Sequence, residues 1–151
     1  MTKILIMVMV IFVTLSMGGR RNVVAQELDF SKYLWKNRLL LLFAPHRSHP
    51  MFDALQQSLA ALEAEVSDRD LVVFEILENG SSRVNTATID SETANELRER
   101  FNVNRGEFNV ILIGKDGGVK LKREESTKLE DIFSLIDSMP MRREEMRQKS
   151  N

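Results

Sequence analysis

The chain has 151 residues, of which 43% are hydrophobic and 28% are charged, and its formal net charge is −1. This length and composition are typical of one globular domain and argue against a fibrous or disordered chain. The chain holds no cysteine. It can therefore form no disulfide, and it cannot carry out thiol–disulfide exchange or thiol peroxidase chemistry.

Residues 1–25 have the features of an export signal. Lys3 gives a positive start, residues 4–15 form an uninterrupted apolar stretch, and Val23 and Ala25 fit the small-residue rule for cleavage after Ala25. The apolar stretch is shorter than the roughly 20 residues that span a bilayer as a helix. We therefore expect a signal peptide over residues 1–25, with a retained anchor as the alternative, and an exported protein, periplasmic or secreted, with no membrane span after cleavage.

The charge of the remaining chain excludes one class of partner. Residues 1–25 contain Lys3, Arg20 and Arg21 and no acidic residue, so their removal leaves a net charge of −4. Binding to nucleic acid depends on a basic surface. We therefore expect no nucleic-acid partner.

The first half of the domain contains two strand patterns and one helical pattern. Residues 39–43 are all apolar, which predicts a strand buried on both faces. Residues 70–77 are rich in β-branched and aromatic residues and predict a second strand. Between them, one helix of four to five turns is predicted to begin near Pro50, because apolar residues recur at steps of three and four; they are Phe52, Leu55, Leu59, Leu62 and Val66.

Residues 78–90 have turn chemistry and few apolar residues, so we expect a surface excursion there. A short helix over residues 92–101 should follow, with Ser91 as its N-cap. Residues 108–114 predict a third buried strand. The Asp116-Gly117 pair then predicts a hairpin to an antiparallel strand over residues 119–123.

The last predicted elements are a helix and a tail. Thr127 and Glu130 have the spacing of a capping box before a helix that Pro140 ends or bends. Residues 141–151 are expected to form a charged, frayed tail. Its main interpretation is a solvated helix extension with charge pairs three and four residues apart, and a contact of its methionines with a partner is the alternative. The domain is thus predicted to span residues 26–140.

The predicted order of elements is β-α-β-α-β-β-α. Strands that are connected through helices should be parallel, and the final hairpin should be antiparallel. This order predicts an α/β, thioredoxin-like three-layer sandwich with a mixed four-stranded sheet.

Three segments resemble a known family: WKNRLLLLFAP (residues 35–45), FNVILIGKDGGVKLK (108–122) and LEDIFSLIDSMPMRREEM (129–146). They are similar to a bacterial family known as domain of unknown function 4174, which is related to domains of animal extracellular proteins of the sushi-repeat and equarin type. Residues 136–146 carry the most specific part of the resemblance. It implies a thioredoxin- or peroxiredoxin-like fold, export and no established reaction, and for the animal relatives a role in matrix or cell-surface interaction.

The chain departs from thioredoxins at the residues that do their chemistry. No cysteine lies in the loop between the first strand and the first helix, where this chain has His46, Arg47, Ser48 and His49. Phe108 stands where the resemblance implies a cis-proline. Substrate backbone is held by that proline in thioredoxins, so its absence argues against docking of a peptide in the same way.

The two histidines of this loop are weak candidates for metal ligands. His46 and His49 could supply two imidazoles, but a metal site needs further ligands. Glu107 is a conceivable third, because the loop before the third strand should face the first loop. The alternatives are that both histidines are solvated loop residues, or that one acts as a general base.

Other residues have one functional and one structural interpretation each. Arg47 and Ser48 could bind an anion at a helix start, but Ser48 is better explained as the N-cap. Tyr33 and Trp35 could contact a partner, whereas packing onto the domain is the more common role of such residues.

The sequence therefore favours an exported, non-catalytic domain that interacts with a protein or the envelope. No cofactor is expected. Two alternatives stay open: a metal-binding or enzymatic protein that uses the loop of His46 and His49, and a factor in an oxidative-stress pathway.

Overall fold

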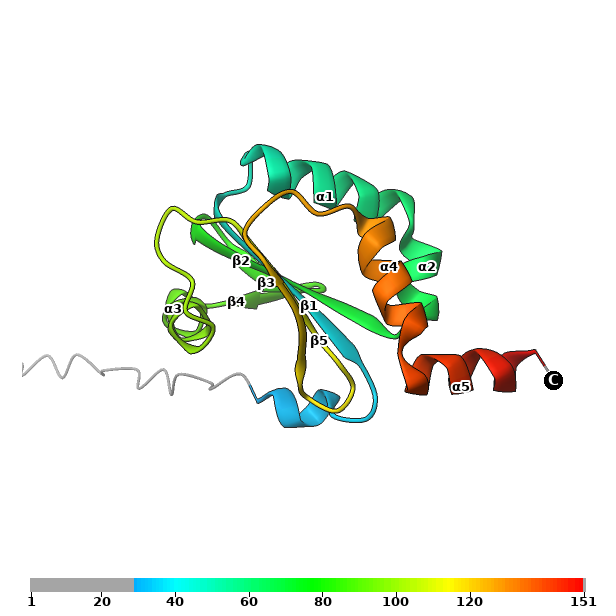
Figure 1. The fold of residues 1–151 in the computed structure, drawn as a ribbon. Helices are drawn as coiled ribbons and strands as arrows, with labels where there is room; N and C mark the ends of the chain where they lie inside the picture. Colours follow the sequence, from blue (N-terminus) through cyan, green and yellow to red (C-terminus); the bar gives the residue numbers. More distant parts are fainter. Residues whose placement is uncertain (1–28, 151) are drawn as a thin grey trace, which may run out of the picture.

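The computed structural model describes residues 29–150, so the expected signal peptide lies outside the described residues. Figure 1 shows a central sheet with helices on both faces. The strands are β1 (Arg38–His46), β2 (Leu71–Asn79), β3 (Ser82–Val84), β4 (Ala87–Ile89), β5 (Asn109–Ile113) and β6 (Val119–Arg123). The helices are the 3₁₀ helix η1 (Phe30–Tyr33), α1 (Pro50–Ala61), α2 (Glu63–Asp68), α3 (Ser91–Arg100), α4 (Leu129–Ser138) and α5 (Pro140–Lys149).

The sheet has six strands in the order β4-β3-β2-β1-β5-β6, so the prediction of four strands is wrong. Strands β1 and β2 are parallel as predicted, and β5 and β6 form the predicted antiparallel hairpin. Strand β5 is antiparallel to β1, although it was expected to be parallel to the strand before it. The reason is that residues 101–108 return the chain to the carboxyl end of β1, where Asn109 pairs with Phe43.

The two additional strands lie in residues 78–90, which were predicted to be a surface excursion. Strands β3 and β4 form a hairpin beside β2. Its turn contains Asn85, at a φ of 51°. Val84 and Ile89 are buried, and the Ser82 hydroxyl accepts a hydrogen bond from the backbone of Leu77. Two apolar side chains suffice to fix such short strands, and the polar residues around them concealed the pattern.

Helix positions differ from the predictions at their ends. The predicted helix of residues 50–66 is divided at Leu62, whose backbone (φ −117°, ψ 37°) leaves helical geometry. Asp90 is the N-cap of α3 in place of Ser91, because its carboxylate accepts the hydrogen bond from the Thr93 N–H at 2.8 Å. Thr127 caps no helix, since its hydroxyl donates to the carbonyl of Glu125, and Lys128 is the N-cap of α4.

The core has one layer on each face of β1, as its apolar run predicted. Side chains of Leu40 and Leu42 pack with α1 and α4, whereas those of Leu39 and Leu41 pack with η1 and α3. Each buried leucine stabilises the fold by about 1.5–3 kcal/mol. Within residues 29–150, no helix has the length and apolar character needed to cross a membrane.

Helix α5 is attached to the amino end of the sheet by charged side chains. Arg142 is only 2% exposed and donates hydrogen bonds to the carboxylates of Asp68 and Asp137. Glu145 accepts two hydrogen bonds, at 3.2 and 3.1 Å, from the buried guanidinium of Arg38. We call this network the α5 clasp; it consists of Arg38, Asp68, Arg69, Asp70, Lys115, Asp137, Arg142, Glu145 and Lys149.

Residues 140–149 form the expected helix extension with i,i+3 charge pairs, but Arg142 is buried in the α5 clasp, so the helix is held on the domain and the expectation of a frayed, solvated tail is wrong. Asp137, Arg142 and Glu145 all come from residues 136–146, the segment that carries the most specific family resemblance. A buried charge that loses its partner costs about 3–5 kcal/mol. The chemistry of this segment is therefore explained by its place in the fold.

Candidate functional site

The carboxyl end of β1 holds the loop of His46, Arg47, Ser48 and His49, which the sequence comparison with thioredoxins singled out as a candidate site. Strand β1 ends at His46, and α1 begins at Pro50, which suits the first helical position. His49 is the N-cap, without a side-chain hydrogen bond, so the assignment of Ser48 as the cap is wrong. The Ser48 hydroxyl lies instead 3.1 Å from Nδ1 of His46.

His49 and Phe108 lie against each other, which confirms that the loop before β5 faces the loop after β1. Their rings are stacked at 5.4 Å between centroids and 4° between planes. Phe108 itself is 5% exposed and belongs to the core on the α1 side. The buried Phe108 thus closes the loop before β5 against the first loop.

In the described part of the chain, His46 and His49 have no third metal ligand beside them. Their ring centroids are 6.1 Å apart. The Glu107 carboxylate accepts hydrogen bonds from the side chain and backbone N–H groups of Asn104, and these bonds lower its pKa. Within residues 29–150, no three His, Cys, Asp or Glu side chains are grouped closely enough to hold a metal ion. Metal binding by His46 and His49 stays a prediction.

Arg47 is not available as a free anion-binding group, because it pairs with Glu75. The Glu75 carboxylate is nearly buried and accepts hydrogen bonds from Arg47 at 2.7 Å and from Arg83 at 2.8 Å. The hydrogen bond to Glu75 raises the pKa of Arg83. Sequence reasoning missed Glu75 because a single carboxylate within an apolar strand carries no sign of its partners.

A second arginine supports this end of the sheet from the α3 side. Arg98 is buried and donates to the carbonyl oxygens of Ala44 at 2.8 Å and Ile76 at 3.3 Å, near the ends of β1 and β2. Burial lowers its pKa. The charged groups of the carboxyl end are thus bound mainly to the protein itself.

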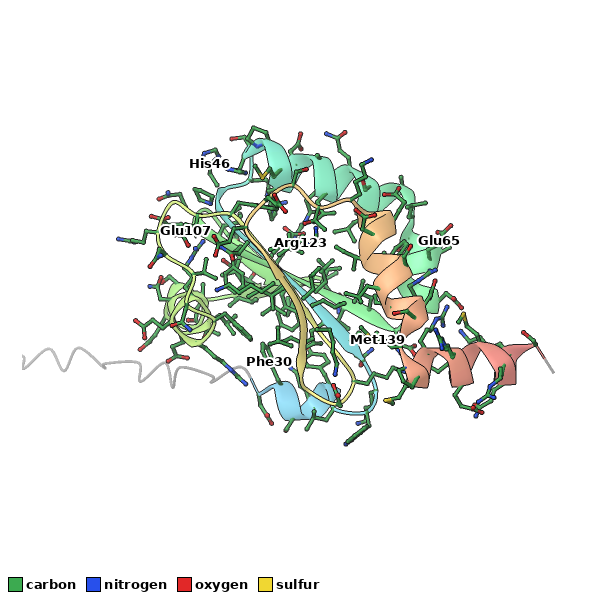
Figure 2. All side chains as sticks on the ribbon, viewed as in Figure 1. Phe30, His46, Glu65, Glu107, Arg123 and Met139 are labelled. Atoms are coloured by element: carbon green, nitrogen blue, oxygen red, sulfur yellow. The ribbon has the colours of Figure 1, made fainter. Side chains whose placement is uncertain are left out.

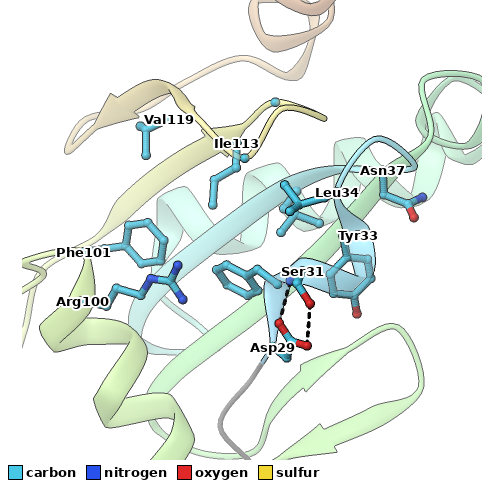
Figure 3. Close-up of a pocket in the computed structure, with 13 residues that line it drawn as sticks. Asp29, Ser31, Tyr33, Leu34, Asn37, Arg100, Phe101, Ile113 and Val119 are labelled. Atoms are coloured by element: carbon cyan, nitrogen blue, oxygen red, sulfur yellow. Dashed lines mark hydrogen bonds between the residues drawn. The ribbon is translucent and has the colours of Figure 1, made fainter.

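The amino end of the sheet contains a groove, which is shown in Figure 3. It has a cavity volume of about 670 Å³. We call it the amino-end groove; the residues that matter below are Phe30, Leu34, Leu39, Arg100, Ile113 and Val119. Its lining comes from η1, from the end of α3, from β1 and from the β5–β6 hairpin. Figure 2 shows that Phe30 and His46 lie at opposite ends of the molecule.

The two aromatic residues before β1 have different roles. Tyr33 packs edge-on against Phe74 with 5.7 Å between ring centroids, so the packing interpretation is confirmed for Tyr33. It is wrong for Trp35, which is 66% exposed and has a φ of 62°. The backbone N–H of Trp35 donates to the carbonyl of Lys115 at 2.7 Å, which places Trp35 beside the β5–β6 turn.

Exposed apolar side chains gather at this turn. Among residues 29–150, five large apolar side chains are exposed, and only Met51 lies at the other end of the molecule. Leu34 lies so close to Gly117 that an added Cβ would be 2.8 Å from its Cδ2. Val119 lines the groove, and Met141 lies with Lys115 at the far side of the turn. The four that gather are Leu34, Trp35, Val119 and Met141.

The sequence profile of the family described as "Domain of unknown function (DUF4174)" matches residues 29–145. The chain belongs to this family. A match of 31% identity over 135 residues relates it to coiled-coil domain-containing protein 80 of Danio rerio, covering 77% of this chain and 15% of that protein. Sushi repeat-containing protein SRPX2 of Bos taurus is 30% identical over 121 residues, covering 76% of this chain and 25% of that protein. The chain thus spans about a quarter or less of these relatives.

A solved structure supports the fold prediction. The reduced 2-Cys peroxiredoxin of Plasmodium vivax matches with a TM-score of 0.57 and 13% identity, over 76% of this chain and 83% of that one. This likeness confirms the thioredoxin-like fold. At this identity it says nothing about activity, and this chain has no cysteine.

Proposed function

We propose that this protein is an exported, non-catalytic thioredoxin-like module that binds a protein partner at its amino-end groove. The observation that carries the proposal is the gathering of Leu34, Trp35 and Val119 at the groove and its turn. Exposed apolar patches with an aromatic member are characteristic of protein contacts. Trp35 in particular covers little of the domain, so packing does not account for it.

Export is supported by the sequence. Residues 4–15 resemble the apolar part of a signal peptide, and cleavage after Ala25 would release the domain into the periplasm or the medium. The resemblance to animal extracellular proteins agrees with this location.

The absence of catalysis is supported by the carboxyl end of the sheet. There Arg47 is paired with Glu75, Glu107 is hydrogen-bonded to Asn104, and an aromatic stack closes the site. With no cysteine in the chain, the inherited position keeps none of the thiol chemistry of its fold.

Site-specific photo-crosslinking in the host cell tests the proposal. The full-length chain carries p-benzoylphenylalanine in place of Val119 or, as the control, in place of Gln57, which is exposed on α1 at the other end. We expect protein adducts from position 119 only. An excess of unlabelled mature wild-type protein should abolish them, and an excess of the Leu34→Asp variant should not. Equal adducts at both positions, or none at 119, would contradict the proposal.

One observation favours a second function, metal binding at His46 and His49. Nδ1 of His49 is buried and has no hydrogen-bond partner within residues 29–150. Zinc and copper titrations of the wild type and of the His46→Ala, His49→Ala double variant test it. Binding in the micromolar range or tighter that the double variant loses would support the metal function. Weak binding that is the same in both proteins would end it.

A further inference from the structure

We propose that the amino-end groove recognises an acidic, apolar segment of its protein partner, with an apolar side chain on the groove floor and a carboxylate on Arg100. This inference rests on the proposed function and specifies the chemistry of the partner. It is carried by three features of the groove: its floor, the way Arg100 is held, and the charges at its rim.

The floor of the groove suits one apolar side chain. Leu39 of β1 and Ile113 of β5 form it, and both are almost fully buried. Leu34 and Val119, which are exposed, stand beside it. The volume of about 670 Å³ lies in the range of roughly 300–1,000 Å³ that is typical of sites for small ligands. A leucine or phenylalanine side chain can therefore enter without rearrangement of the sheet.

Arg100 is held in a position that favours a carboxylate. Its guanidinium carbon lies 4.8 Å from the ring centroid of Phe30 and 5.7 Å from that of Phe101. A guanidinium packed against aromatic rings keeps its N–H groups directed outward, and their planar fork matches the two oxygens of a carboxylate. Within residues 29–150, no acidic side chain forms an ion pair with Arg100. The group is exposed on the last turn of α3.

The charges beside the groove are mostly positive. Lys32 lies over the ring of Tyr33, and Lys122 donates to the backbone carbonyls of Phe101 and Asn102. In the described part of the chain neither lysine forms an ion pair with a carboxylate. Asp29 is the single acidic residue of the groove lining, and its carboxylate already accepts hydrogen bonds from the backbone and hydroxyl of Ser31.

This local excess of cations stands out because residues 26–151 carry a net charge of −4. Complementary charge steers partners and selects among them. A nucleic acid or an anionic membrane would need a wider basic surface than three cations around one groove. An acidic segment of a protein that also carries an apolar side chain matches both the apolar floor of the groove and the positive charges around it.

Selection from a peptide library tests the inference. Phage-displayed random twelve-residue peptides are selected on the mature wild-type protein, and the enriched peptides are synthesised. Their affinities for the wild type and for Arg100→Gln, Arg100→Lys and Arg143→Gln are measured by fluorescence anisotropy. Arg143→Gln is the matched control, because Arg143 is an exposed arginine on α5, away from the groove.

We expect the enriched peptides to place Asp or Glu within three residues of Leu, Ile, Phe or Trp. Arg100→Gln should weaken binding at least about tenfold, Arg100→Lys should weaken it less, and Arg143→Gln should leave it unchanged. Circular dichroism melting checks that the variants are folded. Failure to enrich any peptide, enrichment of neutral or basic peptides, or equal affinity for Arg100→Gln would overturn the inference.

Two further results separate this inference from the proposed function. If the crosslinks from position 119 persist while acidic peptides show no preference, the partner chemistry is wrong and the interaction stands. If vesicles of phosphatidylglycerol bind the wild type but not Arg100→Gln, and no peptide is enriched, the groove recognises a lipid and the inference is overturned.

Discussion

The two ends of the sheet differ in which of their side chains are free to bind a partner. At the carboxyl end, the sequence led us to expect a candidate site in the loop of His46 and His49, but Arg47 is paired with Glu75 and His49 is stacked on Phe108. At the amino end, no resemblance suggested a site, yet Leu34, Trp35 and Arg100 remain exposed beside a groove. Exposed side chains beside a groove are therefore a better guide to a binding site here than the position of the active site in thioredoxins.

At the amino end, the α5 clasp stabilises the fold, whereas the groove is proposed to bind a partner. The largest expected effect of a substitution is a loss of stability in the clasp. Arg142→Ala leaves Asp68 and Asp137 without their shared guanidinium, and we expect a loss of about 3 kcal/mol in the free energy of unfolding. Urea denaturation measures it. Arg143→Ala, one residue away and exposed, is the control and should cost less than about 0.5 kcal/mol. Equal losses would show that the clasp does not stabilise α5.

Acid should weaken the same network. Hydrogen bonds from Lys149 and Arg142 lower the pKa of Asp68 to about 2. Against the cost of their burial, hydrogen bonds from arginines and a lysine lower the pKa of Asp137 and Glu145 as well. Carboxylates with a lowered folded-state pKa stabilise the fold above their ordinary values of 3.8 and 4.5, and this contribution is lost as the pH falls toward about 2.

Urea denaturation between pH 6 and pH 2 should therefore show a decline in stability that begins below about pH 5. The Arg142→Ala variant should show a shallower decline, because part of the network is already absent. Parallel curves for the two proteins would assign the acid sensitivity to other carboxylates.

Two glycines with the same backbone geometry, one beside the groove and one away from it, test whether Leu34 contributes to binding. Gly106 and Gly117 have φ values of 80° and 79°, but an added Cβ meets nothing at Gly106 and meets Leu34 at Gly117. Gly106→Ala and Gly117→Ala should each cost about 1–2 kcal/mol for the left-handed backbone. Only Gly117→Ala should also weaken peptide binding, measured by anisotropy, because Leu34 must move. Equal effects of the two substitutions on peptide binding would show that Leu34 is not part of the binding site.

The smallest expected effect on the stability of the fold is that of replacing Trp35. Its φ of 62° is unfavourable for a side chain, and the ring is largely exposed. Trp35→Gly should therefore change thermal stability by between zero and a gain of about 1 kcal/mol. Lys36→Gly, at a neighbour outside the left-handed region, should be destabilising. A clear loss at Trp35 would show that the ring is needed for packing.

The sequence predicted those parts of the fold that depend on local patterns. The apolar run of β1, the stripe of α1 and the Asp116-Gly117 turn were all visible because their signals lie within a few residues. The cap of α3 was placed one residue too late because two adjacent side chains, Asp90 and Ser91, can serve as caps. The hairpin of β3 and β4 was missed because only two of its buried side chains, Val84 and Ile89, are apolar.

The sequence predicted less of the α5 clasp and of the amino-end groove, because the residues that form them are far apart in the chain. In the α5 clasp, Arg38 and Glu145 are 107 residues apart in the chain, and no local pattern signals such a pair. The same holds for Arg100, whose aromatic neighbours include Phe30, which lies near the start of the described chain. The sequence identified Trp35 as a possible contact, but only the fold shows that its ring is exposed beside a groove.

The central claim is that the amino end, and not the carboxyl end, binds the partner. The most direct measurement is the affinity of the protein captured from position 119, determined by calorimetry for the mature wild type and two variants. Leu34→Asp should weaken binding about thirtyfold or more, as for a central interface residue, while the His46→Ala, His49→Ala variant should bind as the wild type does. Loss of binding in the histidine variant together with full binding by Leu34→Asp would contradict the account.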